Sequence, residues 1–192
     1  MERPLVGEPL AVDLVDTRWH GDAGDEDLLA TPAGLTQWLR ERGLDSPLRR
    51  PAEGAGDPSG EPGGVLERMR AALLHTRAVL RRAFEGEARA QDGVNEVLAH
   101  AVIVRSLEAG RVRDIPMFPD EAWRPAWLAA DDYVRLLQAA PDGIRKCGNP
   151  SCVLYFFDPG GRRRWCSMAR CGNRLKAQRH YARTRLAARP EM

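Results

Sequence analysis

Four cysteines lie within 25 residues of one another in this sequence of 192 residues. They form two pairs, Cys147 with Cys152 and Cys166 with Cys171, separated by 13 residues. Because a short loop lets both sulfurs of a pair face one ion at about 2.3 Å, this spacing predicts a tetrahedral four-cysteine site for one Zn²⁺ per chain. Free thiols, two disulfides and an iron–sulfur cluster are the alternatives that the cysteines leave open.

The residues around the cysteines predict the elements that would hold them. Residues 153–157 predict a strand, 158–161 a turn, and 162–165 an antiparallel return that brings the two pairs together. Asn173 predicts the N-cap of a helix over 174–186. Four cationic side chains, which would offset the negative charge of four thiolates, flank the ligands: Arg145, Lys146, Arg170 and Arg174. The segment thus predicts a treble-clef-like finger, a hairpin followed by a basic helix.

Charge is divided unevenly along the chain. Residues 141–192 carry 12 basic and 3 acidic side chains, a net charge of +9, whereas residues 1–140 carry 17 and 24, a net charge of −7. Arginine on a metal-anchored element can contact phosphates and pair with guanine, so the basic segment predicts a DNA-binding surface. The candidate contacts are Arg162, Arg163, Arg164, Arg174, Lys176, Arg179, Arg183 and Arg185. The first six of these are expected to be exposed and to add little to stability.

Two other interpretations of the basic segment remain open. It could be a solvated face, or one that docks on the acidic N-terminal part of the same chain. The aromatic side chains at 155–157 and 165 could stack on unpaired bases, which would favour RNA, or form the small core of the finger.

The first 140 residues predict a mainly helical domain with little β-structure. Apolar residues at helical spacing predict helices over 31–43, 65–84 and from 125, and a further helix capped by Asp92 and ended by Gly110. Residues 9–19 alternate partly and predict a strand. Residues 45–64, nine of which are Gly or Pro, predict a flexible segment. The predicted architecture is mostly α with minor β, in two parts: 1–140 and 141–192.

The sequence does not favour an enzyme, a membrane protein or an exported protein. Asp13 and Asp16, three apart on the predicted strand, would point to opposite faces. His75 and His100 have no recognisable Ser or Cys nucleophile beside them. No stretch approaches the roughly 20 apolar residues of a membrane span, and the first residues lack the layout of a signal peptide, so we expect a cytoplasmic protein.

The motif Cys166-Ser-Met-Ala-Arg-Cys-Gly-Asn-Arg174, preceded by Arg163-Arg-Trp165, resembles the CGNR zinc finger. This finger ends bacterial proteins described as stress-induced transcription regulators, and the resemblance covers residues 141–185. Three N-terminal segments, Leu14-Val-Asp-Thr17, Asp27-Leu-Leu29 and Trp38-Leu39, are similar to the ABATE domain that precedes the finger in that family. The sequence departs from the family at Asp16, where Asn is usual, and at Pro159-Gly-Gly161, where a Ser-Arg segment is usual.

These observations predict a non-enzymatic, DNA-binding regulator of transcription in the stress response, located at the bacterial nucleoid. The finger would bind DNA, while the N-terminal domain senses a small-molecule effector or joins two copies into a homodimer. The alternatives are a zinc-stabilised module that binds RNA or protein, and a thiol-based redox sensor.

Overall fold

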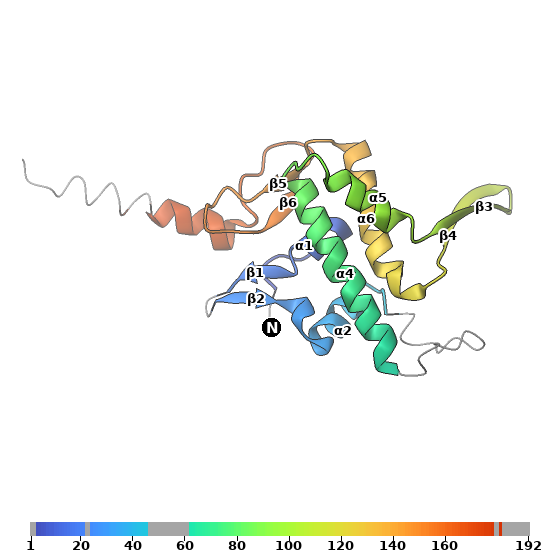
Figure 1. Cartoon of the computed structure of the whole chain (residues 1–192). Helices are drawn as coiled ribbons and strands as arrows, with labels where there is room; N and C mark the ends of the chain where they lie inside the picture. Colours follow the sequence, from blue (N-terminus) through green and yellow to red (C-terminus); the bar gives the residue numbers. More distant parts are fainter. Residues whose placement is uncertain (1–2, 22–23, 46–61, 179–180, 182–192) are drawn as a thin grey trace, which may run out of the picture.

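The computed structural model describes residues 3–21, 24–45, 62–178 and 181 (Figure 1). The described part is mostly helical with three small antiparallel sheets of two strands each, which confirms the predicted fold class. Its main helices are α1 (Leu10–Val15), α2 (Pro32–Glu41), α4 (Pro62–Phe84), α5 (Ala90–Leu98) and α6 (Arg124–Ala139). The long helix α4 runs through the middle of the molecule, and α1, α2, α5 and α6 pack around it (Figure 1).

The helices with one apolar face form close to where the sequence predicts them. Thr31 caps α2, its side-chain oxygen accepting a hydrogen bond from the backbone N–H of Gly34 at 3.1 Å, and Pro32 occupies the first helical position. Gly43, with φ of +66°, follows the C-terminal end of α2. The predicted flexible segment 45–64 lies largely outside the described residues, and α4 begins within it at Pro62.

The strand predicted over residues 9–19 is wrong in its first part, which forms helix α1. Five of the six residues of α1 are buried, because α4 and α6 both pack against this short helix. In a segment that is buried on all sides, apolar residues no longer alternate regularly with polar ones, so the helical period of 3.6 residues cannot be distinguished from the strand period of 2. Only the last two residues of the predicted stretch lie in a strand, β1 (Arg18–His20), which pairs with β2 (Asp25–Asp27).

The helix predicted to end at Gly110 is also too long. Helix α5 ends at Leu98, and Asp92 lies in its first turn rather than at its cap. The next residues form a hairpin of β3 (Val102–Glu108) and β4 (Arg111–Met117). Gly110 belongs to the hairpin turn, where Ala109 and Gly110 have φ of 46° and 75°, values typical of a two-residue turn between antiparallel strands.

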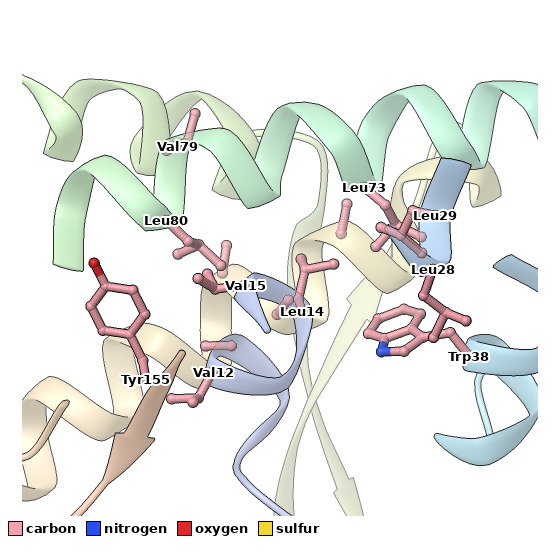
Figure 2. Packing of buried hydrophobic residues seen from close by; sticks show 14 of the residues in the cluster. Val12, Leu14, Val15, Leu28, Leu29, Trp38, Leu73, Val79, Leu80 and Tyr155 are labelled. Atoms are coloured by element: carbon pink, nitrogen blue, oxygen red, sulfur yellow. The ribbon is translucent and has the colours of Figure 1, made fainter. Parts of the chain in front are cut away.

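The buried apolar residues form one cluster that α1 connects to its neighbours. Figure 2 shows Leu14 and Val15 of α1 below Leu73 and Leu80 of α4, with Trp38 of α2 at one end. Tyr155, from the C-terminal part, lies at the other end, its hydroxyl directed toward the end of α4. The short elements η1 (Leu28–Ala30) and η2 (Glu121–Trp123) pack against α2 and α4 respectively. None of the described helices combines the length and apolar character that crossing a membrane requires.

Candidate metal centre

The first cysteine pair lies on a tight turn that follows β5 (Ile144–Lys146). The backbone N–H of Cys147 donates to the carbonyl of Leu154, and that of Cys152 donates to the carbonyl of Asn149, both at 2.9 Å. Asn149 is buried, and its side-chain amide donates to Cys171 Sγ at 3.4 Å while its Oδ1 accepts from Ser151 N. Asn149 therefore holds the first turn and also contacts a sulfur of the second pair.

The second pair lies at the start of the C-terminal helix. Ser167 caps η3 (Met168–Gly172), a π-helical turn, by accepting a hydrogen bond from Arg170 N at 3.1 Å, and residues 173–178 continue the helix. Asn173, predicted as the N-cap, instead has helical dihedrals and follows the turn. Because the helix begins six residues earlier than predicted, Cys171 lies inside it rather than before it.

The four sulfurs are placed as one tetrahedral ion requires. Their Sγ atoms all lie within 4.8 Å of one another; Cys152 and Cys166 are separated by 3.8 Å, and Cys166 and Cys171 by 3.5 Å. A tetrahedron with metal–sulfur bonds of about 2.3 Å has edges of about 3.8 Å. The cysteines are not paired as disulfides. The four sulfurs therefore fit a single metal ion, as the spacing predicts. A cubane iron–sulfur cluster would hold the four cysteine sulfurs farther apart than they lie here.

The thiols influence one another's protonation. The pKa of Cys152 is lowered to about 5, chiefly by a hydrogen bond from the Cys166 thiol. The same hydrogen bond, together with burial, raises the pKa of the donor Cys166, and burial raises the pKa of Cys147. A bound dication supplies the positive charge that stabilises several thiolates in so small a volume.

The predicted hairpin forms with a different partner. Strand β6 (Tyr155–Phe157) pairs with β5, so that Arg145 lies opposite Phe156, whereas residues 162–165 form no strand. The segment 162–165 still approaches the first turn, since the backbone N–H of Gly148 donates to the carbonyl of Arg164 at 2.9 Å. The first cysteine turn is itself the loop that connects β5 to β6, and residues 158–165 then cross toward the second pair.

The structure separates the predicted DNA contacts into three groups. Arg162, Arg164, Arg174 and Lys176 are exposed, as predicted. Arg163 is not: its guanidinium contacts Glu8 Oε1 at 2.7 Å, lies 4.4 Å from the centroid of the Phe156 ring, and donates to the carbonyls of Trp165 and Cys166. The remaining candidates, Arg179, Arg183 and Arg185, lie outside the described residues.

Acidic residues of the N-terminal domain hold the finger. The carboxylate of Asp16 accepts the backbone N–H of Tyr155 at 2.9 Å, and that of Glu8 accepts the backbone N–H of Phe157 at 2.9 Å. Burial raises the pKa of Asp16 well above its ordinary value, and the hydrogen bond from Tyr155 only partly opposes this. Sequence reasoning missed Glu8; it treated Asp16 as half of a failed catalytic pair and as a departure from a family motif, and neither observation placed Asp16 against the finger.

The Tyr155 ring completes this contact. It lies 5.2 Å, centroid to centroid, from the ring of Phe84, the last residue of α4, and its hydroxyl is 3.3 Å from Oε1 of the next residue, Glu85. The Arg81 guanidinium is 5.7 Å from the centre of the Tyr155 ring. Strand β6 therefore joins the metal-binding segment to the helical domain through apolar and polar contacts together.

Comparison with known families divides the chain at nearly the same place. The ABATE family model, described as "Putative stress-induced transcription regulator", matches residues 8–140. The CGNR zinc finger model matches residues 144–184, which include all four cysteines. No curated protein matches the chain. Both resemblances noted from the sequence motifs are thereby confirmed.

Proposed function

Since the chain belongs to the ABATE family and carries a CGNR zinc finger, we propose that it is a zinc-dependent, DNA-binding regulator of transcription in bacterial stress. One Zn²⁺ per chain, held by Cys147, Cys152, Cys166 and Cys171, fixes the finger. The protein acts in the cytoplasm, at the nucleoid. Zinc supplies a structural anchor here, because four protein sulfurs leave no open position for a reacting water.

The observation that carries the proposal is the exposed basic surface of the finger. Arg145, Arg162 and Arg164 are exposed beside the turn at 158–161, and Arg174 and Lys176 are exposed on the C-terminal helix. Elements that the cysteines fix in place carry all five cations, so these groups meet a phosphate backbone without first becoming ordered. Glu8 and Asp16 of the acidic domain contact Tyr155, Phe157 and Arg163 of the finger, and the five cations stay exposed to solvent.

Burial of two of the four aromatic residues argues against RNA recognition by a row of stacked bases. The side chains of Tyr155 and Phe156 are 2% and 1% exposed and belong to the core, whereas Phe157 and Trp165 are partly buried against it. Stacking on unpaired bases requires an exposed ring face. Phosphate and groove contacts by the cations remain, and these suit duplex DNA.

We propose no catalytic role for the acidic and histidine residues of the domain. The carboxylate of Asp13 accepts hydrogen bonds from the side chains of Arg3, Trp38 and Arg42. The ring of His100 stacks on Trp123 at 3.5 Å between centroids, and His75 meets the same indole edge-on. These contacts describe structural residues.

Fluorescence anisotropy with a labelled DNA duplex and a single-stranded RNA of equal length tests the proposal. We expect the zinc-loaded chain to prefer the duplex, with log K falling against log salt by about 0.9 per phosphate contacted. Arg162→Ala with Arg164→Ala should weaken binding and flatten that slope. Arg82→Ala is the matched control, because Arg82 is an exposed arginine of α4 paired with Glu87, away from the metal centre. Equal affinity for RNA, or an Arg82→Ala effect as large as that of the double variant, would contradict the proposal.

Metal analysis of the purified protein tests the zinc assignment independently. We expect one zinc per chain and its loss in the Cys166→Ser variant, because Cys166 Sγ lies 3.8 Å from Cys152 Sγ of the first pair and 3.5 Å from Cys171 Sγ of its own pair. Iron in place of zinc, or no metal in a folded chain with free thiols, would overturn the assignment.

A further inference from the structure

The β3–β4 hairpin, hereafter the arm, extends away from the helices at the end of the molecule opposite the finger (Figure 1). Among the described residues its two strands pair only with each other. A lone two-stranded hairpin is marginally stable in water, and a sheet edge without a partner is open to another chain. The arm therefore requires a covering surface that these residues do not supply.

Large apolar side chains are concentrated on the arm. It holds six of the ten large apolar residues that are exposed in the described part of the chain, with exposed fractions between 47% and 72%. They are Val102, Ile103, Val104, Leu107, Val112 and Met117. At roughly 160 to 200 Å² for a fully exposed residue of these types, these fractions amount to roughly 600 Å² of surface, divided between the two faces of the arm.

Both faces of the arm carry exposed apolar side chains beside a few charged ones, which restricts what can cover it. The register places Ile103 and Leu107 on one face, opposite Pro116 and Val112, and places Val102 and Val104 on the other, opposite Met117 and Ile115. A surface that packed flat against the arm would cover only one face. An occupant that covers both must enclose the arm.

A groove of the matching kind lies at the base of the arm. It has a volume of about 420 Å³ and runs between the Ile103 face of the arm and helix α6, where Leu128 and Val134 form its other wall. The groove also carries Asp114, Asp131 and Arg135, and its two carboxylates are paired within the chain, Asp114 with Arg105 at 2.8 Å and Asp131 with Arg135 at 2.7 Å. At the end of the arm, Glu108 is paired with Arg113 at 3.1 Å. Arg111 is therefore the cation at that end that can add an ion pair with a groove carboxylate of another chain.

We propose that two copies of this chain form a dimer by exchanging arms, each arm lying between the partner's arm and the partner's helix α6. In this arrangement the Ile103 faces of the two arms pack against each other at the two-fold axis. The Val102 face of each arm then packs on the partner's α6, so both apolar faces are covered. Two arms bring roughly 1,200 Å² to the interface before the groove walls are counted, which reaches the range of stable interfaces. The dimer carries one finger at each end.

Light scattering after size exclusion, and sedimentation equilibrium, on the zinc-loaded chain without DNA test the inference. We expect a dimer at micromolar concentration. Leu107→Glu with Val112→Glu should raise the dissociation constant at least about a hundredfold, because charges would enter an apolar contact. Val6→Glu is the matched control, since Val6 is 66% exposed and lies outside the arm. Leu107→Ala with Val112→Ala should weaken the dimer in the same direction, which provides a reading if the glutamate variant does not fold.

A charge exchange tests the geometry of the contact. Arg111→Glu and Asp131→Arg should each weaken the dimer about tenfold, and the two together in one chain should restore it. The inference would be overturned if the wild-type chain stayed monomeric at about 100 μM, or if the arm variants left the dimer intact.

This inference goes beyond the proposed function, and the outcomes of the tests distinguish a failure of one from a failure of the other. A dimer of the predicted kind that fails to bind DNA would refute the function and leave the arm exchange standing. A monomer that binds DNA would do the reverse. A monomer whose exposed arm is covered by another protein or by lipid would also refute the exchange.

Discussion

Replacing Arg163 by alanine should destabilise the fold while leaving DNA affinity almost unchanged. The three consecutive arginines at 162–164 are equivalent in the sequence, yet the structure gives the middle one a different environment. Its side chain is 34% exposed, and its partner Glu8 is 9% exposed. Arg163 connects the finger to the N-terminal segment across 155 positions of sequence.

The magnitude follows from the interactions that the substitution removes. The 2.7 Å contact with Glu8 is a charge-assisted hydrogen bond, a class that contributes about 1.5 to 3 kcal/mol, discounted here because the guanidinium is one-third exposed. The contact with the Phe156 ring adds about 0.5 to 1 kcal/mol, and the hydrogen bond to the Trp165 carbonyl about 1 kcal/mol. We expect a loss of about 3 kcal/mol, which lowers Tm by about 6 to 12 °C in a chain of this size.

Thermal unfolding followed by circular dichroism, with zinc present, measures the change. Arg162→Ala and Arg164→Ala are the controls, and each should move Tm by less than about 2 °C because exposed side chains contribute little. A double-mutant cycle of Glu8→Ala and Arg163→Ala should show coupling of at least about 1 kcal/mol between the two residues. If Arg163→Ala unfolded at the same temperature as Arg162→Ala and lost DNA affinity instead, Arg163 would be a DNA contact and this interpretation would fail.

Three further variations test other parts of the structure. Burial alone would raise the pKa of Asp27, but its hydrogen bond and charge interaction with Arg77 lower it below the ordinary value. The stabilisation from this pair is therefore complete above the ordinary pKa of aspartate and is lost as pH falls through the lowered pKa of Asp27. In that acidic range, urea titrations should show that the free energy of unfolding depends less on pH in Asp27→Asn than in the wild-type chain, and an equal pH dependence would refute the stabilising role of the pair. Gly34→Ala should lower the free energy of unfolding by several kcal/mol, because the new Cβ would lie 2.0 Å from the carbonyl oxygen of Leu28. Replacing a helical glycine by alanine usually raises Tm, so a higher Tm in this variant would show that the clash is relieved. Chelating the metal should unfold the finger and also lower Tm of the helical domain, because Tyr155 packs on α4; a helical transition that chelation leaves unchanged would show that the two parts unfold independently.

The helices that the sequence predicts correctly share one property. Helices α2, α4 and α6 each place one face in the core and another in solvent, so the period of 3.6 is visible in the residue types. Helix α1 is surrounded by other elements, and the arm exposes apolar residues on both faces. In both cases the pattern of apolar and polar residues does not indicate whether the segment is a helix or a strand.

The metal centre was predictable because its geometry is local. Loops of four residues within each pair limit how far two sulfurs can separate, and the preference of a metal for thiolate ligands belongs to the side chain itself. The sequence also determined the separation of charge between finger and domain, since counting residues requires no coordinates.

Only the tertiary structure decided how the finger meets the domain. Strand β6 pairs with β5 rather than with residues 162–165, Asp16 accepts a hydrogen bond from a residue 139 positions away, and Arg163 contacts Glu8 rather than solvent. Each outcome depends on which surface becomes buried when elements distant in sequence pack together. Residue type fixes the chemistry that a side chain can perform, whereas burial determines which partner it meets.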